Sequence, residues 1–159
     1  MIDEIFVIDQ GGTPLFYKCY DTREVDPVLV SSLFSALTTF AKSSSNELDE
    51  VTMSGKKYIF LLNQFFLLTI RVGDTVSKDT IIEKLTKLQE SFLDNFKDII
   101  CEIQKFDGEV SQFDRFEENV LNLFDDVKNK KNTKKSSQFL EDLLGLKKKV
   151  DYQNVLNNL

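Results

Sequence analysis

The sequence contains no His and no Trp, and it has only two Cys and two Pro in 159 residues. The missing His removes the commonest general base, the commonest metal ligand and the usual partner of a nucleophilic Ser or Cys. Cys19 and Cys101 lie far apart, have no zinc-ligand spacing and are expected to be reduced core residues. These absences predict that the protein is not an enzyme and has no catalytic residues, no metal ligands and no cofactor.

Long apolar runs are also missing. The longest, Tyr58–Leu62 and Phe65–Leu68, are far shorter than the roughly 18 residues that a membrane span requires. Asp3 and Glu4 stand where a signal peptide would carry basic residues. We therefore expect a cytoplasmic protein whose membrane contact, if any, is peripheral.

The charge is divided unevenly along the chain. Residues 1–127 carry a net charge of −11, whereas residues 128–159, with 8 Lys and 3 acidic residues, carry +5, and the total is −6. An acidic body argues against a nucleic-acid partner. The basic end could contact the acidic body or an anionic membrane surface.

Two features that resemble functional sites have simpler explanations. The Gly11-Gly12 turn is followed by a strand and lacks the Walker Lys-Ser/Thr, so it does not predict a phosphate site. Neighbouring carboxylates such as Asp49-Glu50 and Asp125-Asp126 are typical of a solvated face, because acid–base pairs require an apolar pocket.

The apolar runs predict five strands. Ile5–Ile8, within the strand Ile2–Asp9, and Phe65–Val72 are the most apolar segments, as expected of central strands covered on both faces. The more polar segments Leu15–Tyr20 and Leu48–Met53 are expected at the edges of the sheet. Tyr58–Leu62 is expected between Phe65–Val72 and the edge segment Leu48–Met53. With strands numbered along the chain, this predicts one antiparallel sheet in the order 2-1-5-4-3.

Three helices are predicted around this sheet. Asp26-Pro27 is a typical helix start, and apolar residues continue at helical spacing to Lys42. Further helices are expected at about Ser77–Phe106 and Ser111–Val127. The result is an α+β fold of order ββαβββαα, with the first helix on one face of the sheet and the other two on the opposite face.

The first helix has two kinds of side chain. Its apolar positions, among them Leu29, Leu33, Phe34 and Phe40, are expected to face the core. The remaining face is small, polar and uncharged, unlike the Lys- and Glu-rich face that solvent usually meets. It predicts a surface where a partner backbone approaches closely, formed by Ser31, Ser35, Thr38 and Thr39. An ordinary solvent face is the alternative.

The C-terminal part is expected to be separate from the domain. We predict a folded domain at 1–127, a Lys-rich linker at 128–136, and an amphipathic helical tail at 137–159. The tail has apolar residues at helical spacing. Those expected to bind an apolar groove, on this domain or on a partner, are Phe139, Leu140, Leu143, Leu144, Leu146 and Val150. A disordered extension is the alternative.

The domain at 1–127 combines this element order with the run Ile5–Asp9, the glycine turn, Pro14–Tyr17 and a Ser- and Ala-rich first helix. In these features it resembles the longin domain, so the resemblance implies a longin-like domain at 1–127. The related roadblock fold begins with a helix instead. No SNARE heptad region is recognisable, so the resemblance is to non-SNARE longins.

The resemblance implies a protein-interaction scaffold in small-GTPase regulation or membrane-traffic assembly. The implied partner is a small GTPase or another longin or roadblock protein, in a homo- or heterodimer. The alternative function is a profilin- or PAS-like ligand-sensing domain.

Overall fold

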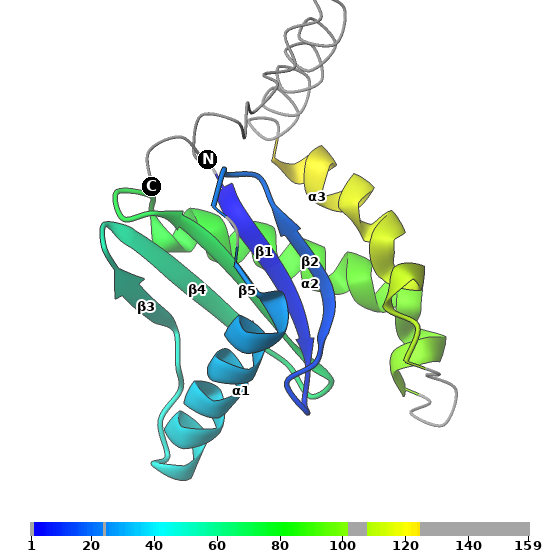
Figure 1. The fold of residues 1–159 in the computed structure, drawn as a ribbon, viewed down its shortest axis with the longest axis horizontal. Coiled ribbons are helices and arrows are strands. Elements are labelled where there is room, and N and C mark those ends of the chain that lie inside the picture. The colour runs from blue at the N-terminus through cyan, green and yellow to red at the C-terminus, as the bar shows by residue number, and fades with distance from the viewer. Residues whose placement is uncertain (1, 24, 102–107, 125–159) are drawn as a thin grey trace, which may run out of the picture. The chain divides into compact units, whose positions relative to one another are not determined.

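The computed structural model describes residues 2–23, 25–101 and 108–124 (Figure 1). The elements follow the predicted order, with a 3-10 helix, η2, before the last helix. They are β1 (Ile2–Asp9), β2 (Pro14–Cys19), α1 (Pro27–Ser43), β3 (Glu50–Met53), β4 (Lys56–Leu62), β5 (Phe66–Gly73), α2 (Lys78–Cys101), η2 (Val110–Phe116) and α3 (Glu117–Leu123). The predicted linker and tail, 128–136 and 137–159, lie outside the described residues and stay predictions.

The five strands form one antiparallel sheet in the order β2-β1-β5-β4-β3, which confirms the sequence prediction. Strand β1 is central and pairs with β2 on one side and with β5 on the other, with Val7 opposite both Phe16 and Leu68. Strand β3 is a four-residue edge that covers only the first half of β4, from Lys56 to Ile59. The continuous apolar runs in β1 and β5 are central because both of their faces are covered.

Helices cover the two faces of the sheet differently, as Figure 1 shows with α1 in front of the sheet and α2 behind it. On the α1 side, a small cluster gathers around Phe34, Phe6 and Tyr58. On the other side, α2, η2 and α3 close a larger core that includes Phe92, Phe96, Phe113 and Phe116. One helix on one face and two on the other is the arrangement predicted from the sequence.

The last predicted helix differs from the structure in its first part. The segment expected as one helix over Ser111–Val127 begins as the 3-10 helix η2 and continues as α3. Phe113 and Phe116, three positions apart, are both buried against α2, and a 3-10 helix places residues i and i+3 on one side. The burial of both Phe113 and Phe116 on the same side is thus compatible with the 3-10 helix η2.

Candidate functional site

Helix α1 begins where the sequence predicts. The Asp26 carboxylate accepts hydrogen bonds from the Val28 N–H at 2.9 Å and the Leu29 N–H at 3.2 Å, and Pro27 occupies the first turn. These contacts satisfy backbone donors that a helix start otherwise leaves unpaired. The cap fixes the start of the helix, and the helix extends to Ser43.

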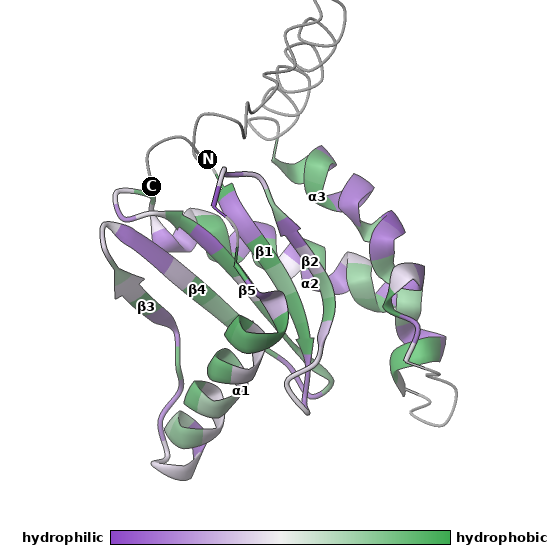
Figure 2. Ribbon diagram, viewed as in Figure 1, coloured by the Kyte–Doolittle hydropathy of each residue, from purple (hydrophilic) through white to green (hydrophobic). Residues whose placement is uncertain are grey.

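The outward side of α1 is apolar. Val28 and Leu29 are 59% and 70% exposed, Leu33 is 49% exposed and Phe40 is 70% exposed. Figure 2 shows hydrophobic residues along most of the helix. We call Leu29, Leu33, Ala36 and Phe40 the outer stripe, because they follow the i, i+4, i+7, i+11 spacing of one helix side and all four are exposed. Clustered exposed apolar side chains of this kind mark interaction sites more often than isolated ones do.

The expectation that all apolar positions of α1 face the core is therefore wrong. Phe34, only 1% exposed, faces the sheet, where its ring centroid lies 4.8 Å from that of Tyr58 and 5.1 Å from that of Phe60. Ser31 and Thr38 also lie on this inner side and are buried. The Thr38 hydroxyl is within 3.0 Å of the Phe34 carbonyl, to which it donates.

The four predicted partner-binding residues are consequently divided between the two sides of α1. Ser31 and Thr38 are buried, Ser35 is half-buried and Thr39 is exposed. In this conformation a partner can reach Thr39 and part of Ser35, but not the side chains of Ser31 and Thr38. Partner contact at the accessible positions stays a prediction.

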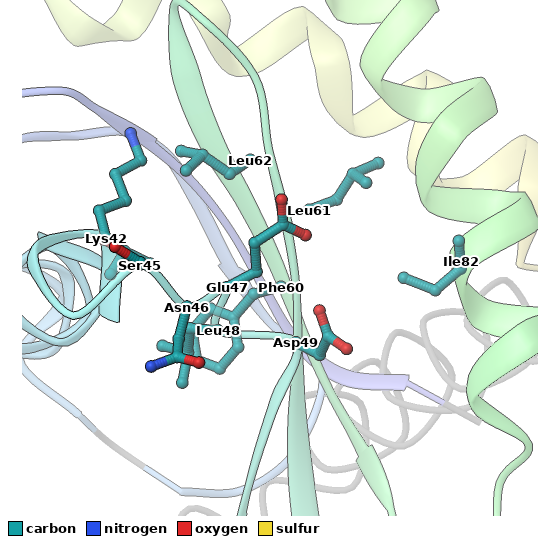
Figure 3. Close-up of a pocket in the computed structure, with 11 residues that line it drawn as sticks. Lys42, Ser45, Asn46, Glu47, Leu48, Asp49, Phe60, Leu61, Leu62 and Ile82 are labelled. Atoms are coloured by element: carbon teal, nitrogen blue, oxygen red, sulfur yellow. The ribbon is translucent and has the colours of Figure 1, made fainter. Parts of the chain in front are cut away.

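An open groove of about 430 Å³ runs beside the C-terminal end of α1 and the free half of β4 (Figure 3). The Phe60 N–H donates to the Asp49 carbonyl at 2.9 Å, and beyond that bond β3 and its preceding loop no longer cover β4. The lining comprises Thr38, Lys42, Ser45, Asn46, Glu47, Leu48, Asp49, Phe60, Leu61, Leu62 and Ile82. The groove combines an apolar floor with a charged rim.

A second groove of about 310 Å³ continues from the first, since Thr38, Lys42 and Leu62 line both. It reaches the β1–β2 turn at Asp9 and the β4–β5 turn at Asn63. Asn63 accepts backbone hydrogen bonds from Phe65 and Phe66 through its side-chain oxygen, which fixes the β4–β5 turn. Both grooves therefore border the C-terminal half of α1.

Beneath the β2–α1 connection lies a buried ionic cluster that the sequence did not reveal. The fully buried Glu4 carboxylate is 3.2 Å from Arg71 Nη1 and 3.1 Å from Arg23 Nη2. The Tyr58 hydroxyl donates to Glu4 at 3.4 Å and accepts from Arg23 at 2.8 Å. Burial alone would lower the pKa of Arg23, but the charges of Glu4 and Tyr58 raise it overall. The cluster ties the connection to the central strands.

Within the described part of the chain, no group of three or more His, Cys, Asp or Glu side chains could hold a metal ion. None of the helices described is long and apolar enough to cross a membrane. The predicted groove-binding residues of the tail, from Phe139 to Val150, lie outside the described residues.

The elements begin in the order ββαβββ, and the strands form a sheet in the order 2-1-5-4-3. One helix covers one face of this sheet and the remaining helices cover the other. This arrangement defines a domain of the longin type. The family model described as the first longin domain of FUZ, MON1 and HPS1 matches residues 3–94, and the chain belongs to this family. The match includes the whole of α1 and favours the longin interpretation over the profilin- or PAS-like alternative.

Several solved structures are similar to the chain at low sequence identity. A chain in a homology model of the full-length AP-3 complex in a stretched open conformation is 16% identical with a TM-score of 0.53, over 87% of this chain and 98% of that one. Myxococcus xanthus MglB is 20% identical with a TM-score of 0.43, over 57% and 85% of the two chains. MglB in a tetrameric arrangement is 14% identical with a TM-score of 0.39, over 47% of this chain and 62% of that one. No curated protein matches the chain.

Proposed function

We propose that this longin domain is a non-catalytic scaffold that pairs through the outer stripe of α1 with another longin or roadblock domain. The pair would serve small-GTPase regulation or the assembly of membrane-traffic complexes at the cytoplasmic side of membranes. The observation that carries the proposal is the exposure of Leu29, Leu33 and Phe40 on a capped, well-packed helix. The longin family supplies the class of partner.

The outer stripe is apolar, which suits packing against a helix or a sheet of a partner. Each large apolar side chain that becomes buried there would stabilise the complex by about 1.5–3 kcal/mol. Ser32, Ala36 and Thr39 are exposed beside the large side chains and are small and uncharged. They leave room for a partner backbone to approach, and no charge needs to be removed from water. The accessible part of the predicted Ser/Thr face thus belongs to the same surface.

The test compares two Leu→Glu substitutions in the full chain. Leu33→Glu adds a charge to the centre of the outer stripe, whereas Leu62→Glu adds the same charge at a similarly exposed leucine, 40% against 49%, at the grooves. Mass by light scattering would be measured alone and with purified longin and roadblock domains from the same genome. Small GTPases from that genome would be added in both nucleotide states.

We expect Leu33→Glu to abolish pairing and Leu62→Glu to preserve it, with both variants folded by circular dichroism. If Leu33→Glu pairs as well as the unmodified chain, the outer stripe is not the interface. If no longin, roadblock or GTPase partner associates with the unmodified chain, the proposed function is wrong.

A further inference from the structure

The second half of β4 is an open edge of the sheet. Pairing with β3 ends at Ile59, and beyond the bond from the Phe60 N–H to the Asp49 carbonyl no described strand lies beside β4 on this side (Figure 1). We propose that this free edge, with the grooves beside it, binds an extended basic segment of a partner protein, which joins the sheet as an added strand. The surface is separate from the outer stripe, so the inference goes beyond the proposed function.

The backbone of β4 is oriented to pair with such a strand. Phe60 donates to Asp49 at the free edge, whereas Asn63 donates to Phe66 on the side of β5. Because backbone groups of successive residues in an antiparallel sheet point to alternate sides, the N–H and C=O of Leu62 point to the free edge, as those of Phe60 do. An extended segment can therefore exchange backbone hydrogen bonds with Leu62, which is how added strands gain affinity.

The free half of β4 lacks the features that usually protect a sheet edge. Natural edge strands discourage pairing with another chain through a Lys, a Pro or a bulge. Phe60, Leu61 and Leu62 include no charged residue and no Pro, and their register with β5 continues without a bulge to the end of the strand. Leu62 is also 40% exposed. This half of β4 thus has the features of a strand that pairs on both sides.

Side chains of an added strand would meet apolar surface on both faces of the sheet. On the face toward α1, Leu62 and Thr38 line both grooves. On the face toward α2, Leu61 and Ile82 line the first groove, and Leu61 packs against the larger core. Successive side chains of a strand point to opposite faces. Two adjacent apolar residues of the segment would therefore contact Leu62 and Leu61, one on each face.

The charge beside the free edge favours a basic segment. Figure 3 shows Glu47 and Asp49 on the side of β4 toward α2, and Lys42 on the other side. Lys78 forms an ion pair with Asp49 at 2.7 Å, and its pKa is raised first by this hydrogen bond and further by charges that include Glu50. Glu47 and Glu50 are exposed, so a Lys or Arg of the segment finds negative charge there. The net charge of −11 for residues 1–127 attracts a basic segment as well.

The test selects peptides without assuming their sequence. A phage-displayed library of random peptides would be selected on the full chain, and enriched peptides would be synthesised with a fluorescent label for anisotropy measurements. Leu62→Pro removes the N–H that points to the free edge, where Pro is compatible with a strand, and Leu62→Ala shortens the side chain but keeps this N–H. Glu47→Lys reverses a charge at the groove, and Glu90→Lys makes the same change at an exposed position farther along α2. Circular dichroism checks that each variant is folded.

We expect the enriched peptides to carry two adjacent apolar residues beside Lys or Arg. Leu62→Pro should weaken their binding by about tenfold more than Leu62→Ala does, because it removes a backbone hydrogen bond and leaves the peptide carbonyl unpaired. Glu47→Lys should weaken binding several-fold, and Glu90→Lys should leave it unchanged. Methylation of the backbone nitrogens of the apolar pair should abolish binding to the unmodified chain, a measurement that does not depend on the folding of Leu62→Pro.

Several results would overturn the inference. They are the absence of enriched peptides, the enrichment of acidic peptides, and binding that tolerates both Leu62→Pro and backbone methylation. If Leu62→Pro lowers the mass of the chain in light scattering, a second copy occupies the edge and the inference is also wrong. Leu33→Glu should bind the peptides normally, and peptides that are lost with this variant would identify the outer stripe as their site. Because pairing and peptide binding use different surfaces, either can fail while the other stands.

Discussion

Gly12 lies directly against Ser35: a Cβ built on Gly12 would be 3.3 Å from the Ser35 Cβ, which is closer than ordinary contact. Gly12 also has a φ of +91°, a conformation that residues with a side chain rarely adopt. The β1–β2 turn and the inner side of α1 therefore depend on two small residues. A large side chain at Ser35 would disturb this packing as well as any partner contact.

Gly12→Ala is expected to destabilise the fold by about 1–3 kcal/mol, because it combines strain at a positive φ with a close contact to α1. The matched control is Gly73→Ala, where an added Cβ meets no atom within 4 Å. Urea unfolding followed by circular dichroism measures both. Equal stabilities of the two variants would show that neither the positive φ nor the contact with Ser35 restricts which residue can occupy position 12.

Two phenylalanines of α1 offer a direct comparison of its sides. Phe34→Ala should cost about 3–5 kcal/mol, since it empties a site packed against Phe6, Tyr58 and Phe60. Phe40→Ala removes the same atoms from a side chain that is mostly exposed, so we expect a change within about 0.5 kcal/mol if nothing covers it. Thermal unfolding of both variants checks this. A large cost for Phe40→Ala would indicate that the outer stripe is covered in the full chain.

The buried Glu4 cluster predicts a strong effect of one acidic residue. Glu4→Ala removes the carboxylate that Arg71 contacts at 3.2 Å and leaves this buried guanidinium only the more distant Asp21 carboxylate, at 3.7 Å. Breaking a buried ion pair in this way should cost up to about 3–5 kcal/mol. Asp49→Ala is the control: its ion pair with Lys78 is largely exposed, so its loss should shift the denaturant midpoint very little. Denaturant midpoints would distinguish the two, and similar midpoints would mean that Glu4 contributes no more than a surface carboxylate.

Tyr20 predicts a loss of stability in alkali. Burial first, and then the nearby charge of Glu117, raise its pKa well above the ordinary value of 10.0. In the unfolded chain Tyr20 ionises near pH 10, so its contribution to stability is fully present below pH 10 and is lost as the pH rises above it. The Tyr20 hydroxyl is buried and has no hydrogen-bond partner among the described residues.

Tyr20→Phe should therefore change stability at pH 7 by no more than about 1 kcal/mol, since it removes an unpaired hydroxyl. Above pH 10 it should flatten the decline of stability that the unmodified chain shows. Unfolding free energies measured on either side of pH 10 provide the test. An identical decline in both proteins would exclude Tyr20 as a source of the alkaline sensitivity.

The sequence was sufficient for the sheet but not for the orientation of α1. The continuous apolar runs of β1 and β5 correctly predicted central strands, because only strands covered on both faces need them. In α1, by contrast, apolar residues occupy both sides of the helix. Residue type alone does not distinguish the buried Phe34 from the exposed Phe40. The side of α1 that faces the sheet depends on contacts made after folding, such as the close approach of Gly12 to Ser35.

The Glu4 cluster could not be predicted for a different reason. Glu4 is 19 positions from Arg23 and 67 positions from Arg71 along the chain, so no local pattern connects them. Glu4 alone resembles an ordinary N-terminal charge. Its burial follows from the central position of β1 between β2 and β5, which only the assembled sheet reveals.

The rings of Phe92, Phe96, Phe113 and Phe116 lie together on the side of the sheet opposite α1, with several edge-to-face contacts. Under the proposed function, recognition by the outer stripe and the packing of this aromatic core fall on different sides of one sheet. Substitutions on the outer stripe would then alter which protein is recognised without repacking the aromatic core. Such a division would let a lineage exchange partners while it inherits the same scaffold.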